Sequence, residues 1–271
     1  MAEIDLCVTR NRDHRAAGPS GRSTGGRAAA PVPFLIVSDI HANREALEAV
    51  LAHAHGDYDR IVCLGDLAGY GADPNFTVEW ARANVSAIVR GNHDRVCAGL
   101  DSLYSYRPAA RAAAEWSLHT LTPENRTYLE RLPRGPLPFE GFDLVHGSPL
   151  DEDDYLMTTA DVTTIRHEIE TRLTFFGHTH IQGGFLIARG GVKTVDPHRT
   201  LELESHCMYL LNPGSVGQPR DGDSHAAYAI YFPLDRVVEF RRVPYDTAAA
   251  AEKIRAAGLP DSLASRLLTG V

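Results

Sequence analysis

The sequence predicts an α/β fold with a parallel sheet at its core. Short apolar runs typical of buried strands alternate with segments whose apolar residues recur at helical spacing. Each strand–helix unit takes up roughly 25 residues, which predicts parallel strands joined by right-handed crossovers. Later runs alternate apolar and polar residues or are joined by hairpin turns, which predicts antiparallel strands added to this core. In the first half, strands are expected over residues 34–37, 61–64 and 87–89, and helices over 44–55 and 74–83.

The composition is that of a globular protein with a substantial core. Of the 271 residues, 44% are hydrophobic and 23% are charged. The net charge of −8 argues against a general nucleic-acid-binding surface. It allows an anionic substrate, because bound dications would dominate the local potential. No apolar stretch approaches the ~20 residues that cross a bilayer, so no association with a membrane is expected. The cysteines form no C-x-x-C pair, and Cys63 lies in an apolar run as a buried thiol would, which favours a cytoplasmic location.

The N-terminal region differs in composition from the rest of the chain. Residues 11–33 are rich in Arg, Gly, Ala and Pro and contain no apolar run. Such a segment cannot bury enough apolar surface to offset the entropy of ordering it. We therefore expect residues 1–32 to form a disordered extension and residues 33–271 to form one domain.

A second region interrupts the strand–helix alternation. Residues 101–135 contain no strand-like run, and we expect helices over 107–121 and 123–132. The second helix is opened by Thr122-Pro123-Glu124, with Thr as the cap and Pro at the first helical position. We therefore expect a small helical insertion. A cap beside the cleft and an ordinary peripheral helix pair both fit its place in the chain.

The second half of the chain is expected to combine both kinds of strand. Apolar runs ending at polar or glycine-rich segments continue the first pattern over 142–145, 173–176 and 208–211. An Ala-rich amphipathic helix follows over 247–257, and a short final helix comes after Leu259-Pro260. The antiparallel strands are expected over 185–187, 201–204, 226–232 and 237–243.

Residue types that bind metals stand where five of the expected strands end. In open α/β sheets, ligands gather at the carboxyl ends of the strands. Any one of these segments is weak evidence by itself, but five of them at strand ends predict a common site. Carboxylate, imidazole and amide groups gathered this way suit two divalent cations that share one carboxylate, as in metal-assisted hydrolysis of phosphate esters. The segments are Asp39-Ile40-His41, Gly65-Asp66, Gly91-Asn92-His93-Asp94, His146-Gly147 and Gly177-His178-Thr179-His180.

In their order, these segments resemble the motifs of the calcineurin-like metallophosphoesterase superfamily. The family order is Asp-x-His, Gly-Asp, Gly-Asn-His-Asp/Glu, His and Gly-His-x-His, and every element is present across residues 39–180. The run from Asn212 to Arg220 resembles the small bacterial and archaeal phosphodiesterase branch. The resemblance covers roughly residues 34–245 and is highly specific. It implies a four-layer α/β/β/α sandwich, in which helices flank two mixed sheets.

The resemblance also implies a centre of two divalent ions. A hydroxide held between them would attack phosphorus in line. Ligands of this kind without thiolate accommodate Mn²⁺, Fe, Zn²⁺, Ni²⁺ or Co²⁺, so the sequence does not identify the metal. The resemblance places Asp39, His41 and His180 on the first ion, Asn92, His146 and His178 on the second, and Asp66 on both.

Five further residues have expected roles beside the ions. His93 would protonate the leaving oxygen, and Asp94 would orient its ring or raise its pKa, with a turn cap as the alternative for Asp94. Arg220 would pair with a substrate phosphate through its guanidinium fork, with an ordinary surface arginine as the alternative. Tyr70 and Asn212 are candidates for lining the cleft.

The expected function is hydrolysis of a phosphate-ester small molecule or a nucleotide, with a phosphodiesterase as the preferred interpretation. Protein serine/threonine phosphatases of the superfamily typically carry Asp-Arg after Gly-Asp, and Glu after Asn-His. This chain instead reads Gly65-Asp66-Leu67-Ala68-Gly69 and Asn92-His93-Asp94, which argues against that alternative. Hydrolysis of symmetrical dinucleoside tetraphosphates is another activity of the superfamily that the sequence allows.

Two expectations concern other molecules. A non-catalytic metal-binding scaffold is the alternative of a different class, and loss of chemistry should show as replaced ligands or a missing His93. All of these residues are present. An antiparallel edge strand in the C-terminal half could pair across a homodimer.

Overall fold

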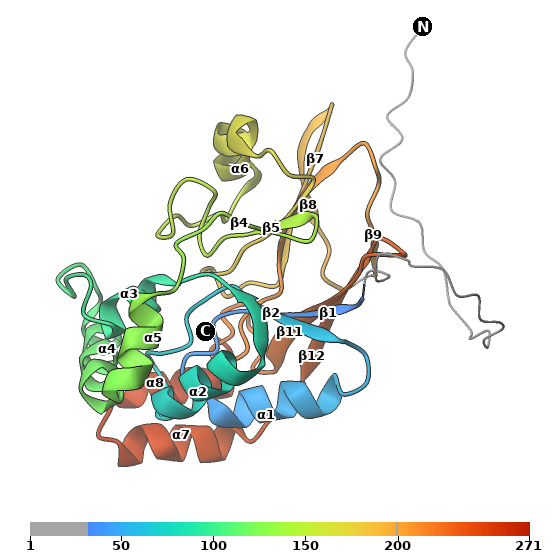
Figure 1. The fold of residues 1–271 in the computed structure, drawn as a ribbon. Coiled ribbons are helices and arrows are strands. Elements are labelled where there is room, and N and C mark those ends of the chain that lie inside the picture. The colour runs from blue at the N-terminus through green and yellow to red at the C-terminus, as the bar shows by residue number, and fades with distance from the viewer. Residues whose placement is uncertain (1–31, 199) are drawn as a thin grey trace, which may run out of the picture.

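The computed structural model describes residues 32–198 and 200–271 as two six-stranded sheets packed face to face with helices on the outside (Figure 1). Both sheets contain parallel and antiparallel pairs, which confirms the implied sandwich of two mixed sheets. The expected N-terminal extension lies outside the described residues, apart from Val32.

The first sheet, sheet A, contains the parallel strands expected from the first half of the chain. Its first three strands are mutually parallel, and the C-terminal strands are added in antiparallel orientation. Both features confirm the prediction. From edge to edge the strands are β3 (Val85–Ile88), β2 (Arg60–Cys63), β1 (Phe34–Val37), β11 (Ala226–Phe232), β12 (Val237–Val243) and β9 (Leu201–Glu202).

The second sheet, sheet B, pairs three parallel strands with antiparallel ones at both edges. The edge strands β4 and β8 were not predicted. None of their residues is buried, so their sequences lack the apolar alternation that reveals a half-buried strand. The strands are β4 (Leu137–Phe139), β5 (Phe142–Leu144), β6 (Leu173–Phe175), β10 (Met208–Asn212), β7 (Gly183–Ala188) and β8 (Gly191–Val195).

Most helices lie on the sheet A side of the sandwich (Figure 1). Thr122 caps its helix as expected, and Asn43 caps another; each side chain accepts a hydrogen bond from a backbone amide. Two short helices, α3 and α6, were not predicted. The helices on this side are α1 (Arg44–His53), α2 (Pro74–Asn84), α3 (Asn92–Cys97), α4 (Pro108–Thr120), α5 (Pro123–Glu130), α7 (Thr247–Ala256) and α8 (Asp261–Thr269).

The helix α6 (Thr159–Ile165), followed by a 3₁₀ turn over Arg166–Glu168, packs on sheet B. It has seven residues, and three of them are threonine, a weak helix former. A capping box supports it: Thr158 accepts from the amide of Asp161, whose carboxylate accepts from the amide of Thr158. Because this short helix depends on its cap, its sequence shows few apolar residues at helical spacing.

The expected helical insertion is present as α4 and α5, which pack on α2 and α3. Ala114, Leu121 and Leu129 of this pair belong to the same buried cluster as the side chains under sheet A. The pair is therefore part of the helical layer. Tyr106, just before α4, is the residue through which this region contacts the candidate site described below.

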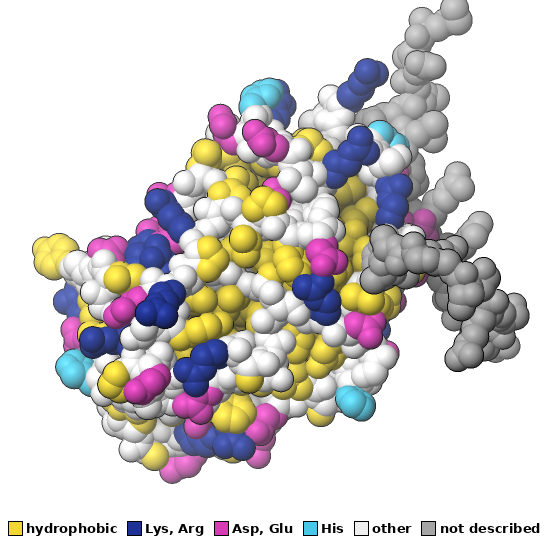
Figure 2. Space-filling view, in the orientation of Figure 1, with side chains coloured by type: hydrophobic (Ala, Val, Ile, Leu, Met, Phe, Trp, Pro, Cys, Tyr) yellow, Lys and Arg dark blue, Asp and Glu magenta, His cyan; other side chains and the backbone are white. Residues whose placement is uncertain are grey.

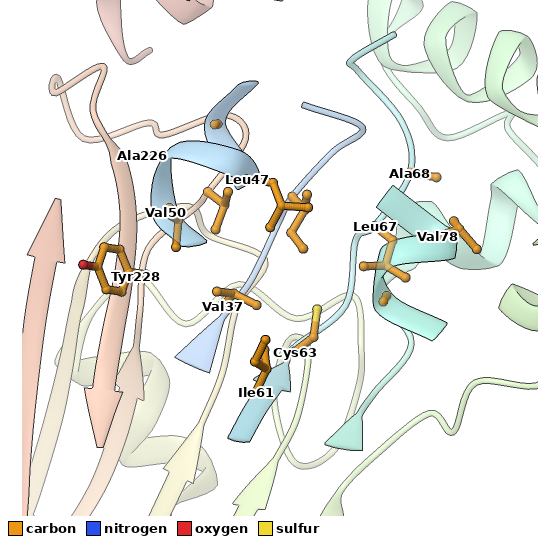
Figure 3. Packing of buried hydrophobic residues seen from close by; sticks show 14 of the residues in the cluster. Val37, Leu47, Val50, Ile61, Cys63, Leu67, Ala68, Val78, Ala226 and Tyr228 are labelled. Atoms are coloured by element: carbon orange, nitrogen blue, oxygen red, sulfur yellow. The ribbon is translucent and has the colours of Figure 1, made fainter. Parts of the chain in front are cut away.

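The core follows the alternation of side chains along the strands. In β1, Leu35 and Val37 face the helices, whereas Phe34 and Ile36 face sheet B. Figure 3 shows the helix-side cluster, in which Cys63 lies among aliphatic side chains. Cys63 is a free, buried thiol as expected, and burial raises its pKa.

No helix among the described residues is long and apolar enough to cross a bilayer. On the face shown in Figure 2, the Lys and Arg side chains of the described residues are interspersed with Asp and Glu. Pairing across a homodimer through an edge strand stays a prediction.

Candidate metal centre

The seven expected metal ligands converge between the carboxyl ends of the strands of the two sheets. All of them are buried. Their ligand atoms form two groups, within each of which the carboxylate and imidazole atoms lie within 4.8 Å of one another. Asn92 joins the second group, since its Oδ1 lies 3.2 Å from Nε2 of His146. The first group is Asp39, His41, Asp66 and His180, and the second is Asp66, His146, His178 and Asn92.

Asp66 is common to both groups. Its Oδ2 lies 3.4 Å from Nε2 of His41 in the first group and 3.4 Å from Nε2 of His146 in the second. Its other oxygen, Oδ1, accepts a hydrogen bond of 2.8 Å from the amide of His93. One carboxylate oxygen therefore faces both groups, while the other fixes the orientation of the side chain.

Hydrogen bonds to backbone carbonyls set the tautomer of three histidines. A carbonyl oxygen can only accept, so the Nδ1 atom beside it carries the proton and donates. The Nε2 lone pair of each ring is then left to face the centre, which is the usual arrangement of histidine ligands. The pairs are His41 with Ala68 at 3.0 Å, His146 with Leu64 at 2.7 Å, and His180 with Gln218 at 2.5 Å.

These lone pairs face one another at close range. Nε2 of His41 lies 3.1 Å from Nε2 of His180, which in turn lies 3.3 Å from Oδ1 of Asp39. In the second group, Nε2 of His146 lies 3.2 Å from Nδ1 of His178. Electron-rich atoms held this close repel one another unless a proton or cation lies between them. The residues therefore fit divalent cations, with nitrogen and oxygen ligands and no thiolate.

The backbone at the centre is held in an unfavourable conformation. Nine non-glycine residues in the described part of the chain have positive φ, and five of them are expected metal ligands. Such a conformation costs on the order of 1–3 kcal/mol per residue and persists where the surroundings enforce it, often at functional sites. The five ligands are Asp39, His41, Asp66, His178 and His180, with φ between 49° and 66°.

The close approach of two loops explains why a glycine stands at position 91. A Cβ atom at Gly91 would lie 2.1 Å from Oδ1 of Asp66 and 2.5 Å from its amide nitrogen. Any side chain there would displace the shared carboxylate. Gly91 therefore lets the loop after β3, which carries Asn92 and His93, pass directly against the loop after β2.

Asp94 organises the backbone. Its carboxylate accepts hydrogen bonds from the amides of Asp66, Leu67, Ala68 and Gly91 at 2.8–3.3 Å. Burial and the nearby charge of Asp66 raise its pKa to about 7, against the lowering effect of the amide donors. The structure shows none of these bonds reaching the His93 ring, so the geometry is that of the turn-cap alternative.

His93 lies beside the first group. Its ring centroid is 4.9 Å from that of His41 and 4.4 Å from that of Tyr70. Its Nδ1 is buried and has no hydrogen-bond partner among the described residues. Burial lowers the pKa of His93 to about 4, with Arg220 also opposing the charged form and Asp66 favouring it.

The carboxylates and imidazoles shift one another's pKa. Burial raises the pKa of Asp66, but His146 and the other imidazoles outweigh this effect and hold it well below its usual range. Burial lowers the pKa of His41, and that of His178 to about 3. For His146, burial lowers the pKa, but the charges of Asp66 and Asp39 and the hydrogen bonds to Asp66 and Leu64 together outweigh it and raise the pKa to about 10. A cation bound at that group would compete with this proton, because a histidine ligand must be neutral.

Asn212 braces the loop that carries two of the histidines. Its Nδ2 donates to the carbonyl of Gly177 at 2.8 Å and to Oγ1 of Thr179 at 3.0 Å. Its Oδ1 accepts from the amide of Gly214 at 2.8 Å. Both donors are engaged in these bonds, so Asn212 supports the loop, and its role as a residue that lines the cleft stays a prediction.

Arg220 and Tyr70 lie together at the edge of the centre. Nη2 of Arg220 donates to the hydroxyl of Tyr70 at 3.1 Å, and the guanidinium carbon lies 5.5 Å from the Tyr70 ring centroid. Tyr70 also packs on His41, at 4.5 Å between ring centroids. Among the described residues, Arg220 forms no ion pair with a carboxylate, so its charge is available to an anion.

Sequence reasoning missed two tyrosines. Nδ2 of Asn92 donates to the hydroxyl of Tyr106 at 2.7 Å, and that hydroxyl donates to the carbonyl of Asn92 at 3.1 Å. Tyr106 thereby orients the amide so that Oδ1 faces His146. Tyr155 packs on His178 with 4.0 Å between ring centroids. Both belong to loops without a motif, so no sequence signal pointed to them.

Comparison with known protein families identifies the superfamily to which this chain belongs. A family model described as the calcineurin-like phosphoesterase superfamily domain matches residues 33–232. The chain belongs to this superfamily. The resemblance seen in the sequence is thereby confirmed, and membership together with the buried Asp/His cluster supports metal-assisted hydrolysis of phosphoesters.

Relatives match this chain over most of its length. A metallophosphoesterase from Sphaerobacter thermophilus is 39% identical, with a TM-score of 0.79, over 89% of this chain and 100% of that one. The uncharacterized protein MJ0912 of Methanocaldococcus jannaschii is 35% identical over 247 residues, which cover 87% of this chain and 97% of that one. A hypothetical protein from Pyrococcus horikoshii, 19% identical with a TM-score of 0.71, shares the fold over 88% of this chain and 98% of its own.

Proposed function

We propose that the protein is a cytoplasmic phosphodiesterase that uses two divalent metal ions to hydrolyse a phosphate-ester small molecule or a nucleotide. The observation that carries this proposal is the position of Asp66. One of its oxygens lies 3.4 Å from an imidazole nitrogen in each of two ligand groups. A carboxylate shared in this way suits a pair of neighbouring cations better than a single one.

The residues divide naturally between two ions. Within the first group, His180 and Asp39 stand 3.3 Å apart and His41 completes the set; within the second, His146 stands 3.2 Å from both Asn92 and His178. Two divalent ions, when bound, polarise the phosphoryl oxygens and lower the pKa of an attacking water. Neutral Asn92 limits the negative charge of the second group, so that an anionic substrate is not repelled.

Two residues would act on the substrate itself. His93 lies beside His41, and we assign it the role of general acid, which gives a proton to the leaving oxygen. Burial lowers its pKa, which favours release of that proton but also lowers the fraction of His93 that is protonated before substrate binds. Arg220 carries a charge that no carboxylate of the described chain neutralises, and its guanidinium would pair with a phosphoryl oxygen.

The direct test of catalysis is hydrolysis of bis-p-nitrophenyl phosphate with added Mn²⁺. The parent protein should turn it over, and His93→Ala should lower kcat by about 10²–10⁴-fold, the usual contribution of a general acid. The metal content of the variant, measured by mass spectrometry, should match that of the parent. If neither protein hydrolyses any phosphoester while both bind metal, the non-catalytic scaffold is the correct interpretation.

The test of the shared ligand is Asp66→Ala. Loss of the common carboxylate should abolish activity and release at least one ion, because both groups lose an anionic ligand at once. Asp235→Ala, which removes an exposed carboxylate from the turn between β11 and β12, is the matched control and should retain both ions. An Asp66→Ala protein that still holds two ions would contradict the assignment.

A panel of phosphate esters would identify the class of substrate that the protein prefers. Phosphomonoesters, phosphodiesters, cyclic nucleotides and dinucleoside polyphosphates should be compared with Mn²⁺, Zn²⁺, Ni²⁺ and Co²⁺. The proposal requires that kcat/KM be highest for a diester. Preference for a dinucleoside tetraphosphate would instead favour that alternative activity of the superfamily.

A further inference from the structure

The loop between β5 and α6 carries an aromatic side chain to the edge of the metal centre. Tyr155 is 53% exposed, although one side of its ring packs on the ring of His178, with 4.0 Å between centroids and 42° between planes. A large ring that is half-covered by an expected metal ligand and half-open to solvent has one face free for another molecule.

The loop is tied firmly to the rest of the site. Glu152 is buried and pairs with Arg90, at 3.0 Å, and with Arg95. Arg95 belongs to α3, the helix that also carries Asn92 and His93. Charge-assisted hydrogen bonds in a buried setting are among the stronger ones, so they anchor the loop to the helix at the centre.

A second set of bonds holds the loop internally. Oγ of Ser148 donates to Asp154 at 2.6 Å and accepts from the amides of Leu150 and Asp151 at 3.0 and 3.1 Å. Tyr155 follows directly after Asp154. Its position is therefore fixed before any ligand arrives, which lowers the entropic cost of a contact with its ring.

Arg220 lies on the same side of the centre. Its backbone amide donates to the carbonyl of His180 at 3.2 Å, two residues after the His178 ring on which Tyr155 packs. Arg220 also donates to Tyr70. Arg220, which forms no ion pair with a carboxylate among the described residues, and Tyr155 thus both lie beside the loop that carries His178 and His180.

The ring of His178 has an unusual environment. Its Nδ1 faces His146, while its Nε2 is buried without a hydrogen-bond partner among the described residues. The other three histidine ligands instead use their second nitrogen to donate to a carbonyl. Tyr155 packs on this ring. An alternative role for Tyr155, holding His178 in place, therefore has to be separated by experiment.

We infer that Arg220 and the open face of Tyr155 form a subsite for phosphate esters of aromatic groups, either a nucleobase-bearing or a simple aryl ester. Arg220 binds the phosphoryl oxygens, and Tyr155 stacks on the aromatic group. This inference rests on the proposed function, because it specifies the substrate class of the same site. An aromatic group on phosphorus can reach Tyr155 because the ring lies directly over an expected ligand, His178.

A binding experiment tests the subsite without catalysis. Phenylphosphonate and methylphosphonate differ in the ring alone, and neither contains an ester bond. Calorimetric titration of the Mn²⁺-loaded protein should show tighter binding of phenylphosphonate by roughly 10-fold, within the range found for stacking on one aromatic side chain. Tyr155→Phe should keep this preference, and Tyr155→Leu, which still covers His178 but offers no ring, should lose it.

The matched control is Tyr104→Ala, which removes a tyrosine that is 87% exposed and contacts none of the expected ligands. It should bind both phosphonates as the parent does. If the parent shows no preference for the phenyl group, or if Tyr155→Leu weakens both ligands equally, the subsite is refuted. Equal weakening would mean that Tyr155 only supports His178.

Hydrolysis separates this inference from the proposed function. Phenyl and methyl p-nitrophenyl phosphate share one leaving group, and the parent should have a higher kcat/KM for the phenyl diester. Tyr155→Leu should lower the ratio of kcat/KM for the phenyl diester to kcat/KM for the methyl diester by roughly 10-fold. A protein that prefers phenylphosphonate but hydrolyses no ester would refute the proposed function while retaining the subsite.

Discussion

The two sheets supply different chemistry to the centre. The loops after β1 and β2 of sheet A contribute both acids, Asp39 and Asp66, whereas the loops after β5 and β6 of sheet B contribute imidazoles alone. The first ligand group therefore contains two carboxylates, and the second has only a share of Asp66. Because Coulomb attraction to a dication scales with ligand charge, the first group should hold its ion more tightly.

The loops are also braced in different ways. On sheet A, the buried carboxylate of Asp94 accepts four backbone amides. On sheet B, the neutral amide of Asn212 donates to Gly177 and Thr179. Four backbone amides of the sheet A loops point toward one place. The two oxygens of the Asp94 carboxylate accept from all four. The comparison shows that charge is concentrated in the sheet A half, both at the ligands and behind them.

The largest expected effect is the loss of activity when a ligand is removed, and it is compared for one ligand from each sheet. Asp39→Ala should lower kcat/KM by about 10³-fold, since Lewis-acid stabilisation is worth several kcal/mol and a tenfold change corresponds to about 1.4 kcal/mol. His178→Ala removes a neutral ligand, so excess Mn²⁺ should restore more of its activity. Activity and bound metal are measured across a Mn²⁺ titration. Equal recovery of the two variants would show that the two groups do not differ in affinity.

The next largest effect is on stability, and it compares Asp94 with Asn212, the residues whose hydrogen bonds hold the loops of the two sheets. Asp94→Ala leaves four amide donors without their acceptor, and the free energy of unfolding should fall by about 3 kcal/mol, at the upper end for an unsatisfied buried group. Asn212→Ala should cost about 2 kcal/mol, because fewer groups lose a partner. Urea denaturation of the metal-free proteins measures both.

For this pair, Asp94→Asn and Asn212→Asp are the conservative controls. Asp94→Asn keeps one oxygen acceptor and should lose less stability than Asp94→Ala. Asn212→Asp replaces the donor nitrogen Nδ2 by an acceptor oxygen that faces the carbonyl of Gly177, and it should be at least as harmful as Asn212→Ala. The reverse order in either case would contradict the assigned hydrogen bonds.

The smallest effect concerns the orientation of Asn92, the neutral ligand that sheet A adds to the second group. Tyr106→Phe removes the hydroxyl that holds this amide, and the affinity for the second ion should fall by roughly 10-fold, the lower range for a partner of a metal ligand. Calorimetric titration with Mn²⁺ should show the weaker binding step shifted and the tighter one unchanged. A shift of the tighter step would place Asn92 in the other group.

The sequence predicted most of the strands because the sandwich buries them on both faces. In β1, Leu35 and Val37 pack under helices while Phe34 and Ile36 pack on the other sheet, so the whole strand is apolar and easily recognised. The missed elements lack such a signal: β8 has no buried residue, and α6 depends on the box between Thr158 and Asp161.

The same limit applies to the candidate site. Its ligands were foreseen because they stand at strand ends, and the carboxyl ends of strands in an α/β fold meet at one place whatever the rest of the chain does. The bracing of Asn212 and the hydrogen bonds of Asp94 were not foreseen as such. Their partners, including Gly177 and Leu67, lie in other loops, and sequence spacing does not show which loop a side chain will reach.

By itself, the sequence determined the alternation of strands and helices, the order of the metal-binding motifs and the reaction class that these residues suit. Periodicity and local residue type are properties of short segments, so they can be read along the chain. Only the tertiary structure decided that one oxygen of Asp66 faces two groups and that Tyr155 covers His178. These contacts join segments far apart in the chain, and the packing of the two sheets against each other fixes the distances between them.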